Sequence, residues 1–119
     1  MRRYVILTHD HPRLHWDLML EADGALRTWR LSGPPKSDTE VPAEPLGDHR
    51  LAYLDYEGPV SGNRGYVTRW DAGVLEWLSE DQESPRVRVK GERLNGELTL
   101  EPGPGGKLVC KYQATDVAR

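Results

Sequence analysis

Short alternating runs of apolar and polar residues, each ended by Gly, Pro or Asp-Gly, constrain the fold of this chain most strongly. No long stretch carries the i, i+3, i+4, i+7 spacing of an amphipathic helix. Short runs that recur about every ten residues are typical of antiparallel sandwiches and barrels. Because a closed barrel leaves no strand edge exposed, the pattern favours a mostly β protein, a small closed antiparallel β-barrel of about eight strands with long loops.

Two dipeptides predict tight turns between strands. Asp23-Gly24 separates two alternating runs and favours a type I′ turn, which requires positive φ at both central residues. Asn95-Gly96 favours a second two-residue hairpin. A short helical turn is expected around 48–50. The expected strands cover 3–8, 14–21, 25–31, 51–56, 65–71, 74–78, 85–94, 97–101 and 107–113.

Three segments lack the alternation of a strand. Residues 32–48 carry four prolines and little apolar material, which predicts a surface loop. Residues 101–106 are expected to form a second, flexible loop, and the C-terminal ATDVAR segment is expected to fray. The chain of 119 residues, numbered 1–119, is expected to form a single domain.

Composition excludes several classes of function. The formal net charge is −3, from 16 basic and 19 acidic residues, so any nucleic-acid contact should be local rather than spread over a basic surface. No apolar run approaches the ~20 residues of a membrane helix. The N-terminus lacks the features of a signal peptide, so we expect a cytoplasmic protein. Cys110, the one cysteine, is expected to be a buried apolar side chain.

A turn at Asp23-Gly24 would set the register of the hairpin around it. Alternate residues then fall on opposite faces, one expected to be core and the other a functional site. The core face would carry Leu14, Trp16, Leu18, Leu20, Trp29 and Leu31. The expected cross-strand pairs are Ala22 with Ala25, Leu20 with Arg27, Leu18 with Trp29 and Asp17 with Arg30.

The opposite face of this hairpin carries residue types that bind metals. His15 and Asp17 share it, and His9 on the preceding segment can reach the same surface. Two imidazoles and a carboxylate suit a borderline divalent metal such as Mn, Fe, Co or Zn, with positions left open for a substrate. Solvated or hydrogen-bonded histidines without a metal are the alternative, and we prefer it for His11. The same face would carry Met19, Glu21, Leu26, Thr28 and Arg30.

The segment HDHPRLHWDLMLEADGALRTWRL resembles the signature of the 3′-phosphoesterase domain of bacterial and archaeal DNA ligase D, in its free-standing form. The family pattern reads HD-x-R-R-L-H-[WY]-D-[FL]-R-L-E-x-D-G-x-L-x-S-W-A-[VL]. The likeness continues through DHRLAYLDYEGPV and, more weakly, through GELTL and KLVCKY. The resemblance implies a small β-barrel enzyme, usually Mn-dependent, that removes a terminal ribonucleoside and then a 3′-phosphate from DNA or RNA–DNA ends during strand-break repair.

The resemblance also implies roles for individual residues. His9, His15 and Asp17 match the metal ligands, for which Mn²⁺ is expected first and Co²⁺ or Zn²⁺ are alternatives. His49 matches the histidine of the phosphate site, and Tyr53 matches a nearby active-site tyrosine. Because His49 and Tyr53 lie four residues apart on an expected strand, they should share a face.

One position departs from the family pattern. The family's arginine two residues after the metal-binding aspartate is Met19 here, and an apolar side chain cannot bind phosphate as an arginine does. We hypothesise that Arg30, which is expected opposite Asp17, supplies the guanidinium instead; a plain Asp17–Arg30 ion pair is the alternative. Further candidates for contacts to the nucleic-acid backbone are Arg13, Arg27, Arg64 and Arg69.

Two other functions are compatible with these residues. His15, Asp17 and His49 also satisfy the pattern of non-haem Fe(II) oxygenases, although this leaves His9 unexplained. A catalytically weakened relative that only binds DNA ends or a repair partner is the second, and Met19 is the feature that favours it. The expected partners are DNA or RNA–DNA 3′ ends and a separately encoded DNA ligase, because a chain of this length should hold no ligase module of its own.

Overall fold

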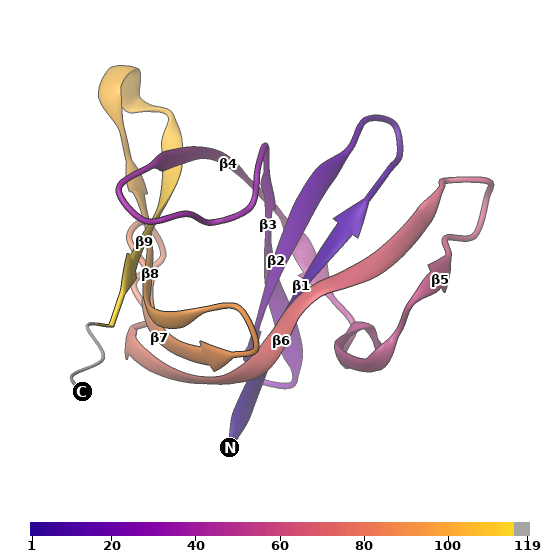
Figure 1. The fold of residues 1–119 in the computed structure, drawn as a ribbon, viewed down its shortest axis with the longest axis horizontal. Helices are drawn as coiled ribbons and strands as arrows, with labels where there is room; N and C mark the ends of the chain where they lie inside the picture. Colours follow the sequence, from indigo (N-terminus) through magenta and orange to yellow (C-terminus); the bar gives the residue numbers. More distant parts are fainter. Residues whose placement is uncertain (116–119) are drawn as a thin grey trace.

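A computed structural model describes residues 1–115 as a closed antiparallel β-barrel, as the alternating runs predict (Figure 1). Eight strands pair in the order β1-β2-β3-β4-β9-β8-β7-β6, and β6 pairs again with β1. The strands are β1 (Arg2–His9), β2 (His15–Ala22), β3 (Ala25–Leu31), β4 (Glu40–His49), β5 (Gly58–Pro59), β6 (Tyr66–Ser79), β7 (Arg86–Gly91), β8 (Asn95–Pro102) and β9 (Leu108–Ala114), and the 3₁₀ helices are η1 (Leu51–Asp55) and η2 (Pro104–Gly106).

The β2–β3 hairpin has the register that its turn residues predict. Asp23 and Gly24 have φ of 53° and 80°, as a type I′ turn requires. All four expected cross-strand pairs occur, including Asp17 opposite Arg30. The turn chemistry therefore determines which side chains of β2 and β3 reach the functional site.

Apolar side chains from every strand of the barrel except β5 meet in its interior. Leu18, Leu20 and Leu31 are fully buried there. Cys110 is buried among them, as expected, and this burial raises the pKa of its thiol to about 12. Leu14 was expected in the core but is 58% exposed, because β2 begins one residue later, at His15.

A second apolar cluster lies on the opposite face of β1 and β2. Met19 packs there in a cluster that includes Val5, Leu26 and Leu54, and Leu54 comes from η1. Figure 1 shows η1 and β5 beside β1 and β6, away from β7, β8 and β9. The face of β2 and β3 that was expected to form the functional site is therefore partly buried core, because η1 packs against it.

Residues 32–48 were expected to form a surface loop, but β4 occupies 40–49. The barrel needs a strand that joins β3 to β9. β4 pairs with β9 only at residues 40–42 and with β3 only at residues 43–49. Each half of β4 therefore has one edge that pairs with no other strand. A proline lacks the N–H that a central strand must donate, and Pro45 can lie in β4 because only one neighbouring strand pairs with that half.

Three further segments differ from expectation. Residues 51–56 were expected to be a strand, but η1 covers most of them and begins just after the helical turn expected at 48–50. The strands expected at 65–71 and 74–78 form one long strand, β6. Asn95 and Gly96 lie within β8, and the β7–β8 turn instead closes at 92–93, where the Gly91 N–H donates to the Leu94 carbonyl over 2.7 Å.

The C-terminal part of the described chain ends with β9. Residues 101–106, expected to be a flexible loop, hold the end of β8 and η2. Of the ATDVAR segment that was expected to fray, residues 116–119 lie outside the described residues. Within residues 1–115, no helix has the length and apolar character that a membrane crossing requires.

Candidate functional site

His9, His15 and Asp17 converge where β1 ends and β2 begins. His9 is the last residue of β1 and pairs in register with His15, the first residue of β2. Their rings are 4.8 Å apart between centroids. The Asp17 carboxylate lies 3.5 Å from His9 Nδ1 and 3.3 Å from His15 Nε2. One nitrogen or oxygen from each residue lies within 4.8 Å of the others, so the three form a group that could hold a metal ion.

Backbone carbonyls orient both imidazoles. His9 Nε2 lies 2.8 Å from the Arg64 carbonyl oxygen, and His15 Nδ1 lies 2.8 Å from that of Arg13. Because a carbonyl oxygen can only accept a hydrogen bond, these two nitrogens carry the protons. The lone pairs of His9 Nδ1 and His15 Nε2 therefore face Asp17, an orientation typical of metal-binding histidines.

Two atoms in this group lack the hydrogen bonds that buried polar atoms normally make. His15 Nε2 and Asp17 Oδ1 lie 3.3 Å apart, but neither makes a hydrogen bond, and their residues are only 5% and 4% exposed. Nearly all buried polar atoms in folded proteins are paired. A divalent cation between two imidazole nitrogens and a carboxylate would satisfy both atoms, so these residues fit such a metal.

His49 and Tyr53 come together beside this group. Their rings lie 5.6 Å apart at an angle of 70°. His49 Nδ1 donates to the Gly47 carbonyl over 2.9 Å, which leaves Nε2 free. The two residues were expected to share one strand, which is wrong. His49 instead ends β4 and Tyr53 belongs to η1, which folds back against the barrel.

One cavity of about 290 Å³ is lined by His9, Asp17, His49 and Tyr53, among other residues. The non-haem iron alternative required His49 as a ligand, but within the described part of the chain the group that could hold a metal contains His9 instead. His15 instead lines a neighbouring cavity of about 460 Å³ together with Arg13 and Leu14, and Arg30 lines both cavities. Lining the first cavity are His9, His11, Pro12, Asp17, Met19, Arg30, Leu46, His49, Tyr53, Val60, Arg64 and Val67.

Arg30 borders both cavities and is not paired with Asp17. Its Nη1 lies 3.7 Å from Glu44 Oε1, and its Nε is buried without a hydrogen-bond partner. Within residues 1–115, no ion pair joins Arg30 to Asp17, although the two residues are opposite each other in register. Met19 is 1% exposed, which explains why this position can be apolar here.

Four other arginines were expected to contact a nucleic-acid backbone. Arg64 lines the site cavity, and Arg13 lines the neighbouring one. Arg27 instead lies between two tryptophans, 5.2 Å from the Trp29 ring and 5.3 Å from the Trp77 ring. The backbone N–H of Arg69 donates to Glu57 over 2.6 Å. The structure thus places Arg64 at the site cavity, Arg13 at the neighbouring cavity and Arg27 in a packing contact.

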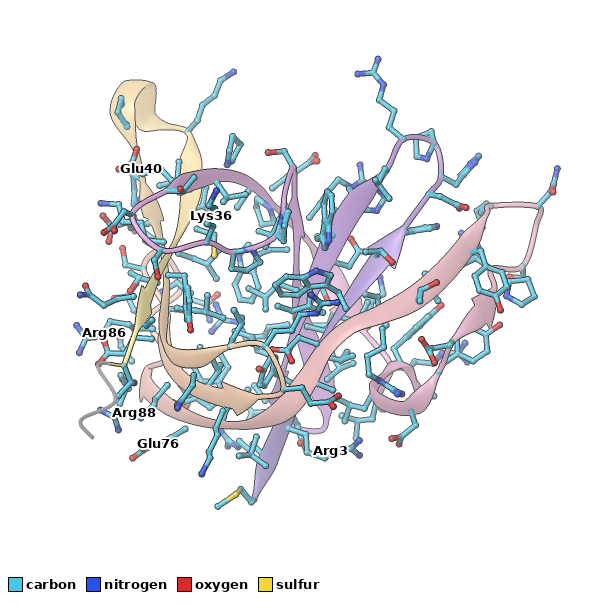
Figure 2. The ribbon with its side chains drawn as sticks, viewed as in Figure 1. Arg3, Lys36, Glu40, Glu76, Arg86 and Arg88 are labelled. Atoms are coloured by element: carbon cyan, nitrogen blue, oxygen red, sulfur yellow. The ribbon has the colours of Figure 1, made fainter. Side chains whose placement is uncertain are left out.

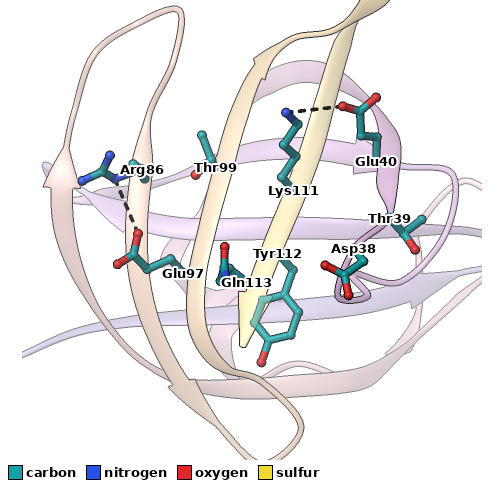
Figure 3. A pocket seen from close by; sticks show the side chains of 9 residues that line it. All are labelled: Asp38, Thr39, Glu40, Arg86, Glu97, Thr99, Lys111, Tyr112 and Gln113. Carbon is teal, nitrogen blue, oxygen red and sulfur yellow. Dashed lines mark ion pairs between the residues drawn. The ribbon is translucent and has the colours of Figure 1, made fainter. Parts of the chain in front are cut away.

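A separate charged cavity of about 420 Å³ lies on the β7–β9 side of the barrel (Figures 2 and 3). Lys111 Nζ lies 3.3 Å from Glu40 and 3.0 Å from Glu101. Arg86 Nε lies 3.7 Å from Glu97, and Figure 3 shows both ion pairs that lie within this cavity's lining. Because these charges already neutralise one another, the cavity shows none of the unsatisfied atoms found around Asp17.

Sequence reasoning missed the atoms that orient the histidines. Both are main-chain carbonyl oxygens, of Arg13 and Arg64, and a backbone atom leaves no signal in residue types. It also missed Glu44, the carboxylate nearest Arg30, because β4 was expected to be a loop.

Comparison with known proteins gives a consistent match. Residues 7–101 match the family model described as the DNA ligase D 3′-phosphoesterase domain. The multifunctional non-homologous end joining protein LigD of Pseudomonas aeruginosa is 35% identical over 108 residues, which cover 82% of this chain and 13% of that protein. The corresponding DNA repair protein LigD of Mycobacterium tuberculosis is 32% identical over 106 residues, with 82% and 14% covered. The chain spans about one seventh of the length of these relatives.

Proposed function

The chain belongs to the DNA ligase D 3′-phosphoesterase domain family, and from this premise we propose that it is a metal-dependent phosphoesterase that heals 3′ ends of DNA or RNA–DNA strands in break repair. The observation that carries the proposal is the pair of buried atoms without a hydrogen bond, His15 Nε2 and Asp17 Oδ1, in a group that His9 completes. A DNA ligase that seals the healed end is the proposed partner.

His9, His15 and Asp17 would hold the metal, with Mn²⁺ as the first candidate and Co²⁺ or Zn²⁺ as alternatives. When bound, such an ion polarises a phosphate oxygen and lowers the pKa of a coordinated water. The Arg13 and Arg64 carbonyls support this role because they keep each ligand imidazole in one tautomer and orientation.

The other side chains of the cavity would act on the phosphoryl group. In the hydrolysis, a water oxygen bonds to phosphorus, the bond from phosphorus to O3′ breaks, and O3′ gains a proton. Arg30 can donate two parallel hydrogen bonds to phosphate oxygens. The Tyr53 hydroxyl can donate a third. With Nδ1 donating to Gly47, the imidazolium form of His49 can use its Nε2–H to stabilise the phosphoryl charge or to protonate O3′.

Phosphate release from a primer–template with a recessed 3′-phosphate tests this function. We expect release with Mn²⁺, none with EDTA, and none from the His15→Ala variant. His11→Ala is the matched control, because His11 lines the cavity but is not in the group that could hold a metal. Equal release by wild type and His15→Ala would contradict the proposed metal ligands.

Binding of DNA ends without hydrolysis is the second candidate function. It is favoured by Met19, a buried apolar residue where the family pattern has arginine. Tight binding of the primer–template without phosphate release, in Mn²⁺, Co²⁺ or Zn²⁺, would support this candidate and contradict the phosphoesterase.

A further inference from the structure

A third cavity of about 250 Å³ adjoins the site cavity on the side of η1. Arg50, Tyr53, Tyr56, Pro59 and Val60 are among its lining residues, and Tyr53 and Val60 line the site cavity too. A molecule that binds its phosphate beside Tyr53 can therefore extend into this second space without leaving the protein surface.

Tyr56 is held in place with part of its surface exposed. Its hydroxyl donates to the Pro59 carbonyl, and its ring is nearly perpendicular to that of Tyr53, with 6.0 Å between centroids. Gly58, with φ of 147°, leaves room for this side chain, since a Cβ there would lie 2.9 Å from the Tyr56 hydroxyl. Tyr56 nevertheless remains 37% exposed. A ring that is fixed but partly open to solvent is suited to stacking.

Arg50 adds a positive charge at the same cavity. Its side chain is exposed and makes no hydrogen bond or ion pair with any residue of the described chain, 1–115. Apolar surface comes from Pro59 and Val60. Aromatic rings with a nearby arginine are the usual means by which proteins bind an unpaired base without reading its identity.

We propose that this cavity binds the nucleobase of the nucleotide that carries the 3′-phosphate, with the base stacked on Tyr56. This inference rests on the proposed function and names the part of the substrate that the site recognises beyond its phosphate. The neighbouring cavity on the other side of Arg30 contains no tyrosine or tryptophan and offers no comparable ring. A stacked terminal base also explains how an acidic chain binds a strand end through a few local contacts.

The test compares two primer–templates that differ only at the terminal nucleotide of the primer, which lies opposite an abasic template position and is therefore unpaired. One has 2-aminopurine deoxyribose 3′-phosphate, and the other has an abasic tetrahydrofuran 3′-phosphate. Affinity is measured by anisotropy of a distant label in EDTA, and stacking by quenching of 2-aminopurine fluorescence. Tyr56→Leu removes the ring, Tyr56→Phe retains it, and Tyr66→Leu is the control, since Tyr66 is an exposed tyrosine of β6.

We expect wild type and Tyr66→Leu to bind the base-bearing end about tenfold more tightly than the abasic end, in line with typical stacking energies. Tyr56→Phe should retain this preference and the quenching, whereas Tyr56→Leu should lose both and bind the abasic end as wild type does. Equal affinity of wild type for both ends, or a preference that survives Tyr56→Leu, would overturn the inference. Phosphate release in Mn²⁺ is measured separately, so a lack of hydrolysis with the base preference intact would contradict only the proposed function.

Discussion

Met19 and Arg30 are the two residues on which the proposed phosphate contact of this site depends. Met19 packs in the apolar cluster under η1 and also lines the site cavity, to which it brings an apolar surface. Arg30 lies on β3 opposite Asp17, with its guanidinium at the edge of the same cavity. Its ion pair with Glu44, at 3.7 Å between two partly exposed side chains, is too weak to prevent phosphate binding.

Arg30→Ala is predicted to reduce phosphate release about 10- to 100-fold, because hydrogen bonds between charged groups contribute ~1.5–3 kcal/mol each. Arg30→Lys should recover only part of the loss, since lysine cannot donate a planar pair of hydrogen bonds. The measurement is kcat/KM for a recessed 3′-phosphate in Mn²⁺. Arg88→Ala, at an exposed ion pair with Glu76, is the control. Unchanged kcat/KM in Arg30→Ala would exclude the replacement of the missing arginine.

At the scale of elements, η1 determines the shape of the site. This helix places Tyr53 at the site cavity, while its Leu54 side chain is buried in the second apolar cluster. Asp55 joins the end of η1 to β1, because its carboxylate accepts a hydrogen bond from Arg3 Nη2 over 2.7 Å. The buried Leu54 and the exposed Arg3–Asp55 ion pair thus both hold η1, and with it Tyr53, against the barrel.

The Arg3–Asp55 contact predicts a pH dependence of stability. Hydrogen bonding to Arg3 lowers the pKa of the Asp55 carboxyl in the folded protein. The contact should therefore stabilise the fold above the unfolded pKa of about 3.9 and lose this effect as pH falls through the lowered folded pKa. Asp55→Asn should lower the urea midpoint slightly at pH 7 and by less at pH 2. Glu92→Gln is the control. A difference in urea midpoint between Asp55→Asn and wild type that grows at low pH would contradict the assignment.

At the scale of the whole molecule, Asp71 connects distant parts of the barrel. This carboxylate of β6 is 1% exposed and accepts the Tyr4 hydroxyl of β1 over 2.6 Å. It also accepts the N–H groups of Arg93 and Leu94 in the β7–β8 turn, over 2.9 Å and 3.1 Å. Burial and this hydrogen bond raise the pKa of Tyr4, so its hydroxyl stays a donor at ordinary pH.

Asp71→Ala is predicted to lower the free energy of unfolding by at least about 2 kcal/mol, because it leaves the Tyr4 hydroxyl and the Leu94 N–H buried without a partner, at ~1–3 kcal/mol for each buried group. Tyr4→Phe removes one donor and should cost only about 1–2 kcal/mol. Urea unfolding followed by tryptophan fluorescence measures both values. Glu76→Ala, at an exposed carboxylate, is the control. A urea midpoint for Asp71→Ala equal to that of wild type would show that this network does not hold the barrel together.

Features that depend on residues close together in the chain could be predicted from the sequence. Alternation along the chain indicated strands, and Asp23-Gly24 set the β2–β3 register, so Asp17 and Arg30 were correctly placed opposite each other. The grouping of His9, His15 and Asp17 was also predictable, because these residues lie within one short segment. In each case the physical reason is local, since side-chain periodicity and turn conformation require no distant part of the chain.

Features that depend on contacts between distant segments could not be predicted in this way. Residues 40–49 form β4 despite their prolines because the barrel must join β3 to β9. Residues 51–55 form η1 rather than a strand, with Leu54 buried against the apolar face of β1 and β2, and so bring Tyr53 to His49 by a route that strand periodicity could not indicate. The carbonyls that orient His9 and His15 are backbone atoms, which every residue has. Their positions follow from the path of the folded chain and leave no trace in the residue types.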